Sequence, residues 1–438
     1  MIAPARRLAY ETIRASFERD AHTERFFREA ADERGLEGRE RAQAQRLAYG
    51  AVQRRGTTDA ALERLVDRPL RELDPPLIAA LRLGMYELLF ADGTPDHAAV
   101  DQAVELVKRA GAAHAAGLVN AVLRRAARER EALVESLLGD DSTPEAAAVA
   151  HSAPLWLAQM WWRELGPEDA RSMLAACNEP AEHAFRVNTL RTNVESVLAR
   201  LRDAGVTASG APYPPMAGKK RTGSEWQLPE MIVVEGQTGG AVPEMVAAGE
   251  LTPQSRGSAA VVEVLDPQPG EQVLDLCAGP GIKTGQIAAR MGDRGEVISV
   301  ENDPGRAAEV AGQARRLGLR SVTVIETDAT EAGMTGFDRV LLDGPCSDLG
   351  ALASRPDARW RKSPATIDRL VEVQSRLLDR ARQALRPGGT LVYSTCTISR
   401  RENEDQVSGG DQFQLRPDRD RTTGFFISRL RRDDGDDE

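Results

Sequence analysis

Hydrophobic side chains in the first third of the chain recur with the spacing of α-helices. The pattern is clear in LAYETIRASF, in PPLIAALRLGMYELLF and in HAAVDQAVELVKRAG. Gly35, the Asp74-Pro75-Pro76 sequence and the Gly93-Thr94-Pro95 sequence interrupt it, as helix breakers do. We therefore expect residues 1–138 to form an all-α domain.

The middle of the chain mixes two periodicities. Helical spacing covers residues 156–165 and 195–204, and the run AFRVNTLR between them is typical of a strand. The run SGAPYPPMAGKKRTGSEW has the proline and glycine content of a loop. Residues 139–254 are expected to form a small α+β segment that links two larger domains.

Short apolar runs alternate with helical segments from residue 255 to residue 438. The runs EQVLDLC, GEVISVE, VTVIET, FDRVLLD and GTLVYST predict strands, and helices are expected after Lys283, Pro304, Thr366 and Glu402. This alternation predicts a doubly wound, Rossmann-like α/β domain with a parallel sheet. The run FQLRPDRDRTTGFFISRLRRD is expected to add an antiparallel hairpin.

The composition narrows the class of protein. Of the 438 residues 41% are hydrophobic and 28% charged, as in a water-soluble globular protein. No apolar run reaches the roughly 18 residues of a membrane helix, and the N-terminus lacks the apolar core of a secretory signal. The four cysteines show no CxxC spacing and the five histidines are scattered. We expect a cytoplasmic protein with free thiols, no bound metal and no membrane partner.

The net charge of −10 argues against a protein that coats nucleic acid without specificity. It does not exclude an enzyme that binds RNA through local cations. Arg355, Arg359, Arg361 and Lys362 are candidates for phosphate contacts, and a solvated charged loop is the alternative.

The turn after the first strand of the α/β domain predicts a cofactor site. It comprises Cys277, Ala278, Gly279, Pro280, Gly281, Ile282 and Lys283. Glycines let a backbone approach a ligand closely, and the N-terminus of the following helix favours an anionic group. Glu301 and Asp328 end the next two strands, where acids suit ribose hydroxyls and an adenine amino group. This order of acids fits S-adenosylmethionine better than NAD, and an empty turn with solvated acids is the alternative.

Cys346 and Cys396 each follow a predicted strand at the edge where α/β sheets bind ligands. A thiolate that adds to C6 of cytosine turns C5 into a nucleophile that can accept a methyl group. Asp343, three residues before Cys346, is placed to contact the pyrimidine edge. A cysteine near a strand end is otherwise a small buried hydrophobe, which is what we expect of Cys177 and of the thiol of Cys277.

The motifs LDLCAGPGIKT, LLDGPCSDLG and YSTCTISRRENE resemble, in order and spacing, those of the RNA cytosine-C5 methyltransferases of the Nop2/Sun/RsmB type. The runs RLGMYELLF, PDHAAVDQAVELVKRA and GLVNAVLRR are similar to the NusB-like N-terminal domain that the 16S rRNA enzymes of this family carry. The resemblance covers almost the whole chain.

The resemblance implies a class I S-adenosylmethionine methyltransferase domain behind a NusB-like domain that helps to hold RNA. The implied reaction is methylation of a cytidine in 16S rRNA, with no DNA substrate, and we expect a monomer. Cys396 would add to C6 and Cys346 would assist product release. The residues Cys277–Lys283, Glu301, Asp328 and Asp343 would hold the cofactor, and Asp343 would also face the base.

The sequence departs from the family pattern at three places. Ile282 stands where glycine is usual, Asp348-Leu349-Gly350 replaces a stretch of small residues, and Gly409 with Gly410 shortens the helix expected after Glu402. Two alternative functions stay open. One is the same chemistry on tRNA or another RNA, and the other is a NusB-like RNA-binding assembly factor with a vestigial methyltransferase domain.

Overall fold

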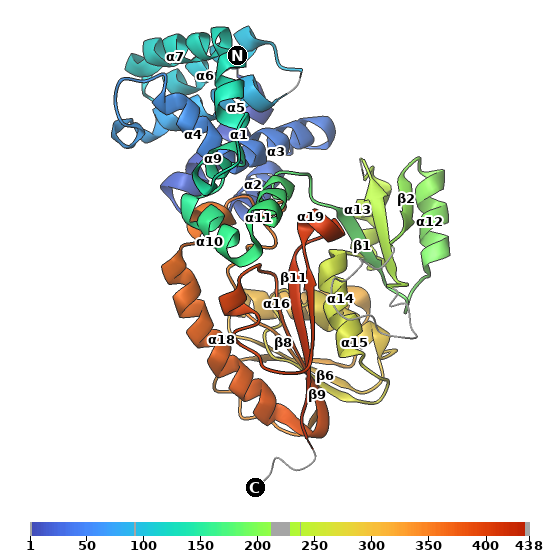
Figure 1. The fold of residues 1–438 in the computed structure, drawn as a ribbon. Helices are drawn as coiled ribbons and strands as arrows, with labels where there is room; N and C mark the ends of the chain where they lie inside the picture. The colour runs from blue at the N-terminus through green and yellow to red at the C-terminus, as the bar shows by residue number, and fades with distance from the viewer. Residues whose placement is uncertain (1, 92, 212–227, 237, 434–438) are drawn as a thin grey trace. The chain divides into compact units, whose positions relative to one another are not determined.

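The computed structural model describes residues 2–91, 93–211, 228–236 and 238–433, and Figure 1 draws the chain. The chain divides into two compact units. A helical unit comprises Met1–Glu179 and Leu352–Ser363, and a sheet unit comprises Pro180–Ala351 and Pro364–Glu438. The division into three parts at residues 138 and 254 stays a prediction. Within the described ranges, no helix combines the length and the apolar character needed to cross a membrane.

The helical unit is all-α, as the hydrophobic spacing predicts. Helix α5 is apolar on nearly every side and forms its centre, since Leu81, Leu83, Met85 and Leu88 are at most 1% exposed. The helices are α1 (Pro4–Glu18), α2 (Thr23–Glu33), α3 (Gly38–Gln53), α4 (Arg55–Glu63), α5 (Pro75–Phe90), α6 (Asp96–Arg109), α7 (Ala116–Arg128), α8 (Arg130–Leu138), α9 (Pro144–Ala150), α10 (Leu155–Leu165), α11 (Pro167–Ala176) and α17 (Ala358–Arg361), with 3₁₀ turns η1 (Leu70–Glu72) and η2 (Ala113–Ala115).

The sheet unit begins with a small antiparallel sheet in the order β2-β3-β1-β4. Its strands are β1 (His183–Val187), β2 (Thr207–Gly210), β3 (Met231–Glu235) and β4 (Leu251–Pro253), packed against α12 (Val194–Asp203) and α13 (Ala241–Ala247) through an apolar cluster. The predicted strand AFRVNTLR and the helix after it are confirmed. Most of the predicted loop, with Lys219, Lys220 and Arg221, lies outside the described residues.

The larger sheet of this unit has seven strands in the order β10-β11-β9-β8-β5-β6-β7. Strands β5 (Gln272–Asp275), β6 (Glu296–Glu301), β7 (Val322–Glu326), β8 (Phe337–Asp343) and β9 (Leu385–Thr395) are parallel. Strands β10 (Asp411–Leu415) and β11 (Phe425–Arg431) add an antiparallel hairpin on β9. The predicted Rossmann-like sheet and its terminal hairpin are thus confirmed.

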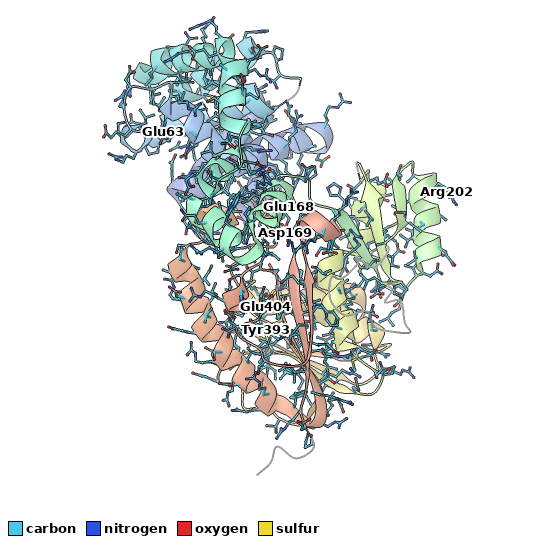
Figure 2. All side chains as sticks on the ribbon, viewed as in Figure 1. Glu63, Glu168, Asp169, Arg202, Tyr393 and Glu404 are labelled. Carbon is cyan, nitrogen blue, oxygen red and sulfur yellow. The ribbon has the colours of Figure 1, made fainter. Side chains whose placement is uncertain are left out.

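Helices cover both faces of this sheet (Figure 1). Helices α14 (Arg256–Leu265) and α15 (Ile282–Arg290) pack on one face with Leu341 and Val392. Helix α18 (Pro364–Ala384) packs on the other with Leu342 and Tyr393, the latter labelled in Figure 2. Neighbouring residues on a strand point to opposite faces, so the apolar runs of β8 and β9 fill both interfaces. Helix α16 (Pro304–Leu317) packs on β6 and β7, and α19 (Pro417–Asp420) is a single turn.

The helix expected after Glu402 is wrong. The described residues there form a 3₁₀ turn, η3 (Arg400–Glu402), followed by irregular turns before β10. Gly409 and Gly410 have φ of +77° and +71°, which a right-handed helix excludes. Asn403, with φ −115° and ψ −99°, leaves the helical region directly after the turn. The side chains of Glu402 and Asn403 are instead used to hold neighbouring loops.

Arg359 was a candidate for phosphate contact, and this expectation is wrong. Its side chain lies inside the helical unit with 1% of its surface exposed. The guanidinium donates to the carbonyl oxygens of Ser152 at 2.9 Å and Cys177 at 2.9 Å, and to Asn178 Oδ1 at 3.1 Å. Burial lowers its pKa to about 10, so it stays charged at neutral pH. Arg359 therefore ties the segment Leu352–Ser363 to the helical unit.

We predict that Arg359→Ala lowers the free energy of unfolding of the helical unit by about 2–4 kcal/mol, because buried carbonyl groups lose their donors. Urea denaturation followed by circular dichroism measures the change. Arg39→Ala, at an exposed position of α3 in the same unit, is the control and should change stability by less than about 0.5 kcal/mol. Equal stability of the two variants would contradict this account.

Candidate active site

Acids gather at the carboxyl edge of the parallel sheet. Asp343, Asp275 and Glu301 end the neighbouring strands β8, β5 and β6, and Asp328 follows β7. Burial and then the charges of these four acids raise the pKa of the Cys277 thiol. All four carboxylates act on this one thiol, so they lie around the same part of the sheet edge. The raised pKa keeps the Cys277 thiol protonated. A protonated thiol can line a binding site but is a poor nucleophile.

The turn between β5 and α15 has the conformation that its glycines permit. Gly279 and Gly281 have φ of +56° and +83°. A Cβ atom on Gly281 would lie 3.0 Å from the Cα of Val310, so the backbone there leaves no room for a side chain. The N–H of Gly279 donates to Glu301 Oε2 at 2.9 Å. Ile282 begins α15 and avoids positive φ, as its β-branched side chain requires.

Asp275 carries a second indication of a ligand at this turn. Thr284 Oγ1 donates to its Oδ2 at 2.6 Å, while its Oδ1 is buried with no hydrogen-bond partner among the described residues. Burial, the largest cause, raises the pKa of Asp275 to about 7. A buried carboxylate oxygen without a partner suits a cationic ligand or one that donates a hydrogen bond. The turn and its acids therefore fit S-adenosylmethionine, a cation with donor groups.

Asp343 is held in one orientation from two sides. Lys283 Nζ donates to its Oδ2 at 2.6 Å, and Ser394 Oγ of β9 donates to its Oδ1 at 2.7 Å. The ammonium group of Lys283 also lies 4.9 Å from the centre of the Phe425 ring. Asp343 thus joins the cofactor turn, through Lys283, to the strand that Cys396 directly follows.

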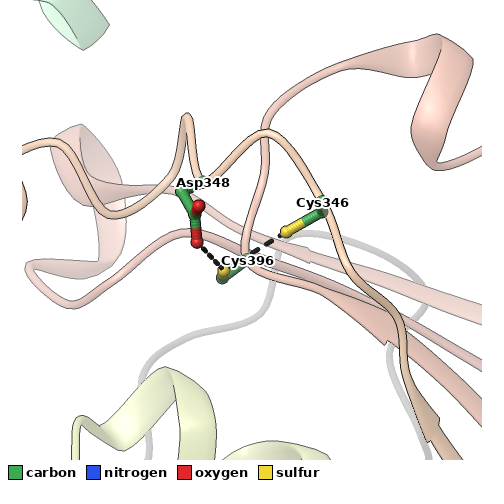
Figure 3. Close-up of side chains that lie close together, drawn as sticks. All are labelled: Cys346, Asp348 and Cys396. Atoms are coloured by element: carbon green, nitrogen blue, oxygen red, sulfur yellow. Dashed lines mark hydrogen bonds between the residues drawn. The ribbon is translucent and has the colours of Figure 1, made fainter. Parts of the chain in front are cut away.

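Cys346 and Cys396 meet where β8 and β9 end (Figure 3). Their Sγ atoms are 3.3 Å apart, and Cys396 Sγ donates to Asp348 Oδ1 at 3.3 Å. Among the described residues these three side chains are the group of possible metal ligands, with the ligand atoms within 4.8 Å of one another. A thiol has one proton to donate. The proton of Cys396 points to Asp348, so Cys346 is the donor between the two sulfur atoms.

The loops that carry the thiols are braced by Glu402, which the sequence did not single out. The N–H and Oγ of Ser347 donate to its carboxylate oxygens at 2.9 and 2.5 Å. Gln374 Nε2 donates to Glu402 at 3.3 Å and to the carbonyl oxygen of Pro345 at 2.8 Å. Tyr393 donates its hydroxyl to the Glu402 carbonyl oxygen at 2.6 Å. The signal was present in the sequence, because Glu402 belongs to the run YSTCTISRRENE.

Asn403 braces the second loop in the same way. Thr395 Oγ1 donates to Asn403 Oδ1 at 2.6 Å, and Asn403 Nδ2 donates to the Thr397 carbonyl oxygen at 3.0 Å. Cys396 lies between these two threonines, so Asn403 fixes the backbone on both sides of the thiol.

Three family models match this chain. The model of the 16S rRNA methyltransferase RsmB/F family matches residues 262–412, and that of the NusB family matches residues 3–128. The model of the ferredoxin-like domain of RsmF/B-like methyltransferases matches residues 153–217.

Relatives match over most of their length. The probable ribosomal RNA small subunit methyltransferase B of Synechocystis is 35% identical, covering 92% of this chain and 88% of that protein. The probable enzyme of the same name from Bacillus subtilis is 32% identical, covering 82% and 77%. A putative methyltransferase from Mycobacterium tuberculosis is 34% identical, covering 98% and 96%.

Solved structures share the fold. The crystal structure of PH0851 aligns with a TM-score of 0.80 at 25% identity over 98% of this chain and 99% of that one. A methyltransferase homologue from Pyrococcus horikoshii aligns with a TM-score of 0.56 at 25% identity over 68% and 99%. NSun6 from Pyrococcus horikoshii, solved with SFG, aligns with a TM-score of 0.54 at 23% identity over 64% and 98%.

The raised pKa of Asp275 predicts a pH dependence of stability. The folded protein keeps the proton to about pH 7, whereas the unfolded chain releases it near pH 4, so wild-type stability falls as the pH rises through this window. Wild type should lose free energy of unfolding between pH 5 and pH 7, and we expect Asp275→Asn to remove about 2 kcal/mol of this loss. Urea denaturation at both pH values measures it. Asp266→Asn, at an exposed aspartate, is the control, and the same pH slope in all three proteins would contradict the shift.

Proposed function

Because the chain belongs to the RsmB/F family of 16S rRNA methyltransferases, we propose that it methylates C5 of a cytidine in 16S rRNA through a covalent cysteine–C6 adduct. The chain is an RNA (cytosine-C5) methyltransferase, and its methyl donor is S-adenosylmethionine. The observation that carries the proposed mechanism is the pair of thiols, 3.3 Å apart, beside Asp343 at the carboxyl edge of the sheet.

The cofactor is proposed to lie along the glycine turn, Cys277, Ala278, Gly279, Pro280, Gly281, Ile282 and Lys283, with Glu301, Asp328 and Asp343 around it. A Cβ atom on Gly279 would meet no other atom within 4 Å, so the turn is open to a ligand there. The oxygen of Asp275 that has no partner among the described residues supports adding that residue to the set. When bound, the cofactor supplies a methyl group on a positively charged sulfur. The acids of this edge favour that charge, and their side chains select a cationic ligand.

Cys396 is proposed as the nucleophile. Its sulfur forms a bond to C6 of cytosine, and the electron pair of the C5–C6 double bond moves toward the ring carbonyl and N3, which makes C5 nucleophilic. Asp343 faces the edge of the base, and its fixed orientation between Lys283 and Ser394 supports this role. The target base must leave its stack to reach the two thiols.

Cys346 is proposed to assist release. After C5 gains the methyl group it still carries its proton, and removal of that proton restores the C5–C6 double bond and expels the Cys396 sulfur. Cys346 lies at hydrogen-bonding distance from Cys396 and can hand its proton to the departing sulfur. The thiolate left on Cys346 can then take the C5 proton, which returns Cys346 to a thiol.

The 16S rRNA assignment rests on the NusB family match at residues 3–128 and on relatives named for the small ribosomal subunit. The boundaries at residues 138 and 254 remain part of the proposal. Both thiols and the acids of the cofactor edge are retained, which disfavours an assembly factor with a vestigial catalytic domain. If the substrate were tRNA, the presence of the NusB-like region would have no explanation.

We predict that Cys396→Ala abolishes methyl transfer from labelled S-adenosylmethionine to an unmodified 16S rRNA transcript, by at least about 10³-fold, because no adduct can form. Cys346→Ala should instead accumulate a protein–RNA adduct that survives a denaturing gel, because the sulfur is not expelled. Cys177→Ala, at a buried cysteine of the helical unit, is the control and should retain wild-type activity.

The two roles are separable by these outcomes. Transfer by Cys396→Ala, or a lack of adduct with Cys346→Ala, would refute the assignment of roles. Transfer to tRNA transcripts with no transfer to 16S rRNA would refute the substrate while leaving the chemistry intact.

A further inference from the structure

We propose that Asp348 is the catalytic base that takes the proton of the Cys396 thiol when the sulfur attacks C6. The inference rests on the proposed role of Cys396 as nucleophile. Asp348 is among the residues at which this sequence departs from the family pattern, and its carboxylate contacts the reacting sulfur. A general base must lie within hydrogen-bonding reach of the proton it removes. Asp348 meets that requirement with a sulfur–oxygen distance of 3.3 Å.

The backbone at Asp348 aims this carboxylate. Its φ is +59°, in the left-handed region that glycine, asparagine and aspartate tolerate best. The chain on both sides is fixed, because Ser347 donates to Glu402 and the N–H of Gly350 donates to the Cys396 carbonyl oxygen at 2.9 Å. The loop that holds Asp348 is therefore bonded to the residue that Asp348 is proposed to deprotonate.

The hydrogen bonds form a chain that ends on the carboxylate. Cys346 donates to Cys396 Sγ, and Cys396 donates to Asp348 Oδ1. When Cys396 attacks, its proton moves to Asp348, the sulfur–carbon bond forms, and the electron pair of the C5–C6 bond moves into the ring. Cys346 keeps its proton and stabilises the developing thiolate. The transfer moves a proton from one of these side chains to another, so it leaves the total charge of the three unchanged until the sulfur bonds to carbon.

Other titratable groups surround the thiol pair. Glu402 and Tyr393 lie on the loop and the strand beside it. Asp343, which accepts a hydrogen bond from Lys283, ends the strand before Cys346. Burial raises the pKa of Glu402 and that of Tyr393. All four groups are unchanged in a variant of Asp348. A difference between the pH profiles of wild type and variant therefore reports on Asp348.

The test measures the rate of adduct formation between pH 6 and 8. It uses the full-length chain, S-adenosylmethionine and an unmodified 16S rRNA transcript, with adduct quantified on denaturing gels in the Cys346→Ala background. Methyl transfer is followed in parallel with Cys346 intact. A chelator in every buffer keeps divalent metal away from the three ligand atoms. Asp348→Asn tolerates the same backbone and keeps an oxygen acceptor but cannot take a proton. Asp348→Gly removes the whole side chain at a φ that suits glycine.

With Asp348 present, we expect a rate that varies little over this pH range, since the proton passes to the carboxylate in contact with the sulfur and not to solvent. Both variants must lose the thiol proton to solvent, so their rates should rise with pH, by up to about tenfold per pH unit. At pH 7 the variants should be about 10²-fold slower, the lower end of the usual contribution of a general base. Asp266→Asn, at another aspartate with positive φ, should match wild type.

Two outcomes would overturn the proposal. Asp348→Asn could show the wild-type rate and profile, so that no base is needed at this position. It could also be slower by a constant factor at every pH, so that the side chain only positions the loop. Failure of the proposed function is distinguished from both, because the Cys346→Ala protein with Asp348 intact would then form no adduct at any pH.

Discussion

The contact between the buried carboxylate of Glu402 and Ser347 is the interaction on which the geometry of the thiol pair depends. Glu402 is fully buried, and a buried carboxylate is costly unless donors surround it. Ser347 supplies two donors and Gln374 a third. Because Ser347 follows Cys346 directly, these bonds fix the loop after β8 to the segment after β9. A sulfur–sulfur distance of 3.3 Å between residues 50 positions apart needs such a brace.

The backbone reinforces the same constraint. Gly350 donates to the Cys396 carbonyl oxygen, and Gly424 donates to the Gly350 carbonyl oxygen, both at 2.9 Å. A Cβ atom on Gly350 would collide with the carbonyl oxygen of Gly424, so only glycine allows the three segments to lie this close. Gly424 directly precedes β11, the second strand of the antiparallel hairpin. The hairpin thus does more than extend the sheet, because it supports the loop that carries Asp348.

Much of the fold follows from the sequence, because periodicity reports which face of an element is buried. The strands that end at Asp275, Glu301 and Asp343 could be placed from apolar runs, and the meeting of their ends follows from a parallel sheet. Prediction from the sequence failed where a side chain forms hydrogen bonds with a segment far away in the chain. The helix after Glu402 is absent because its first side chains bond to the thiol loops, and Arg359 is buried because carbonyl groups of residues 152 and 177 surround it. These hydrogen-bond partners lie far from Glu402 and Arg359 in the sequence, so the pattern of neighbouring residues does not reveal them.

The two halves of the site place opposite demands on charge. Acids at the ends of four strands favour a cationic methyl donor. They disfavour a thiolate nearby, since burial and then the charges of these acids raise the pKa of the Cys277 thiol. A nucleophilic cysteine at this edge has to give up its proton when its sulfur bonds to C6. Transfer to a neighbouring carboxylate leaves the total charge unchanged, whereas loss to solvent would add a further negative charge to the acids. The features that bind the cofactor thus create the need for a local proton acceptor, and Asp348 is the carboxylate in contact with the sulfur.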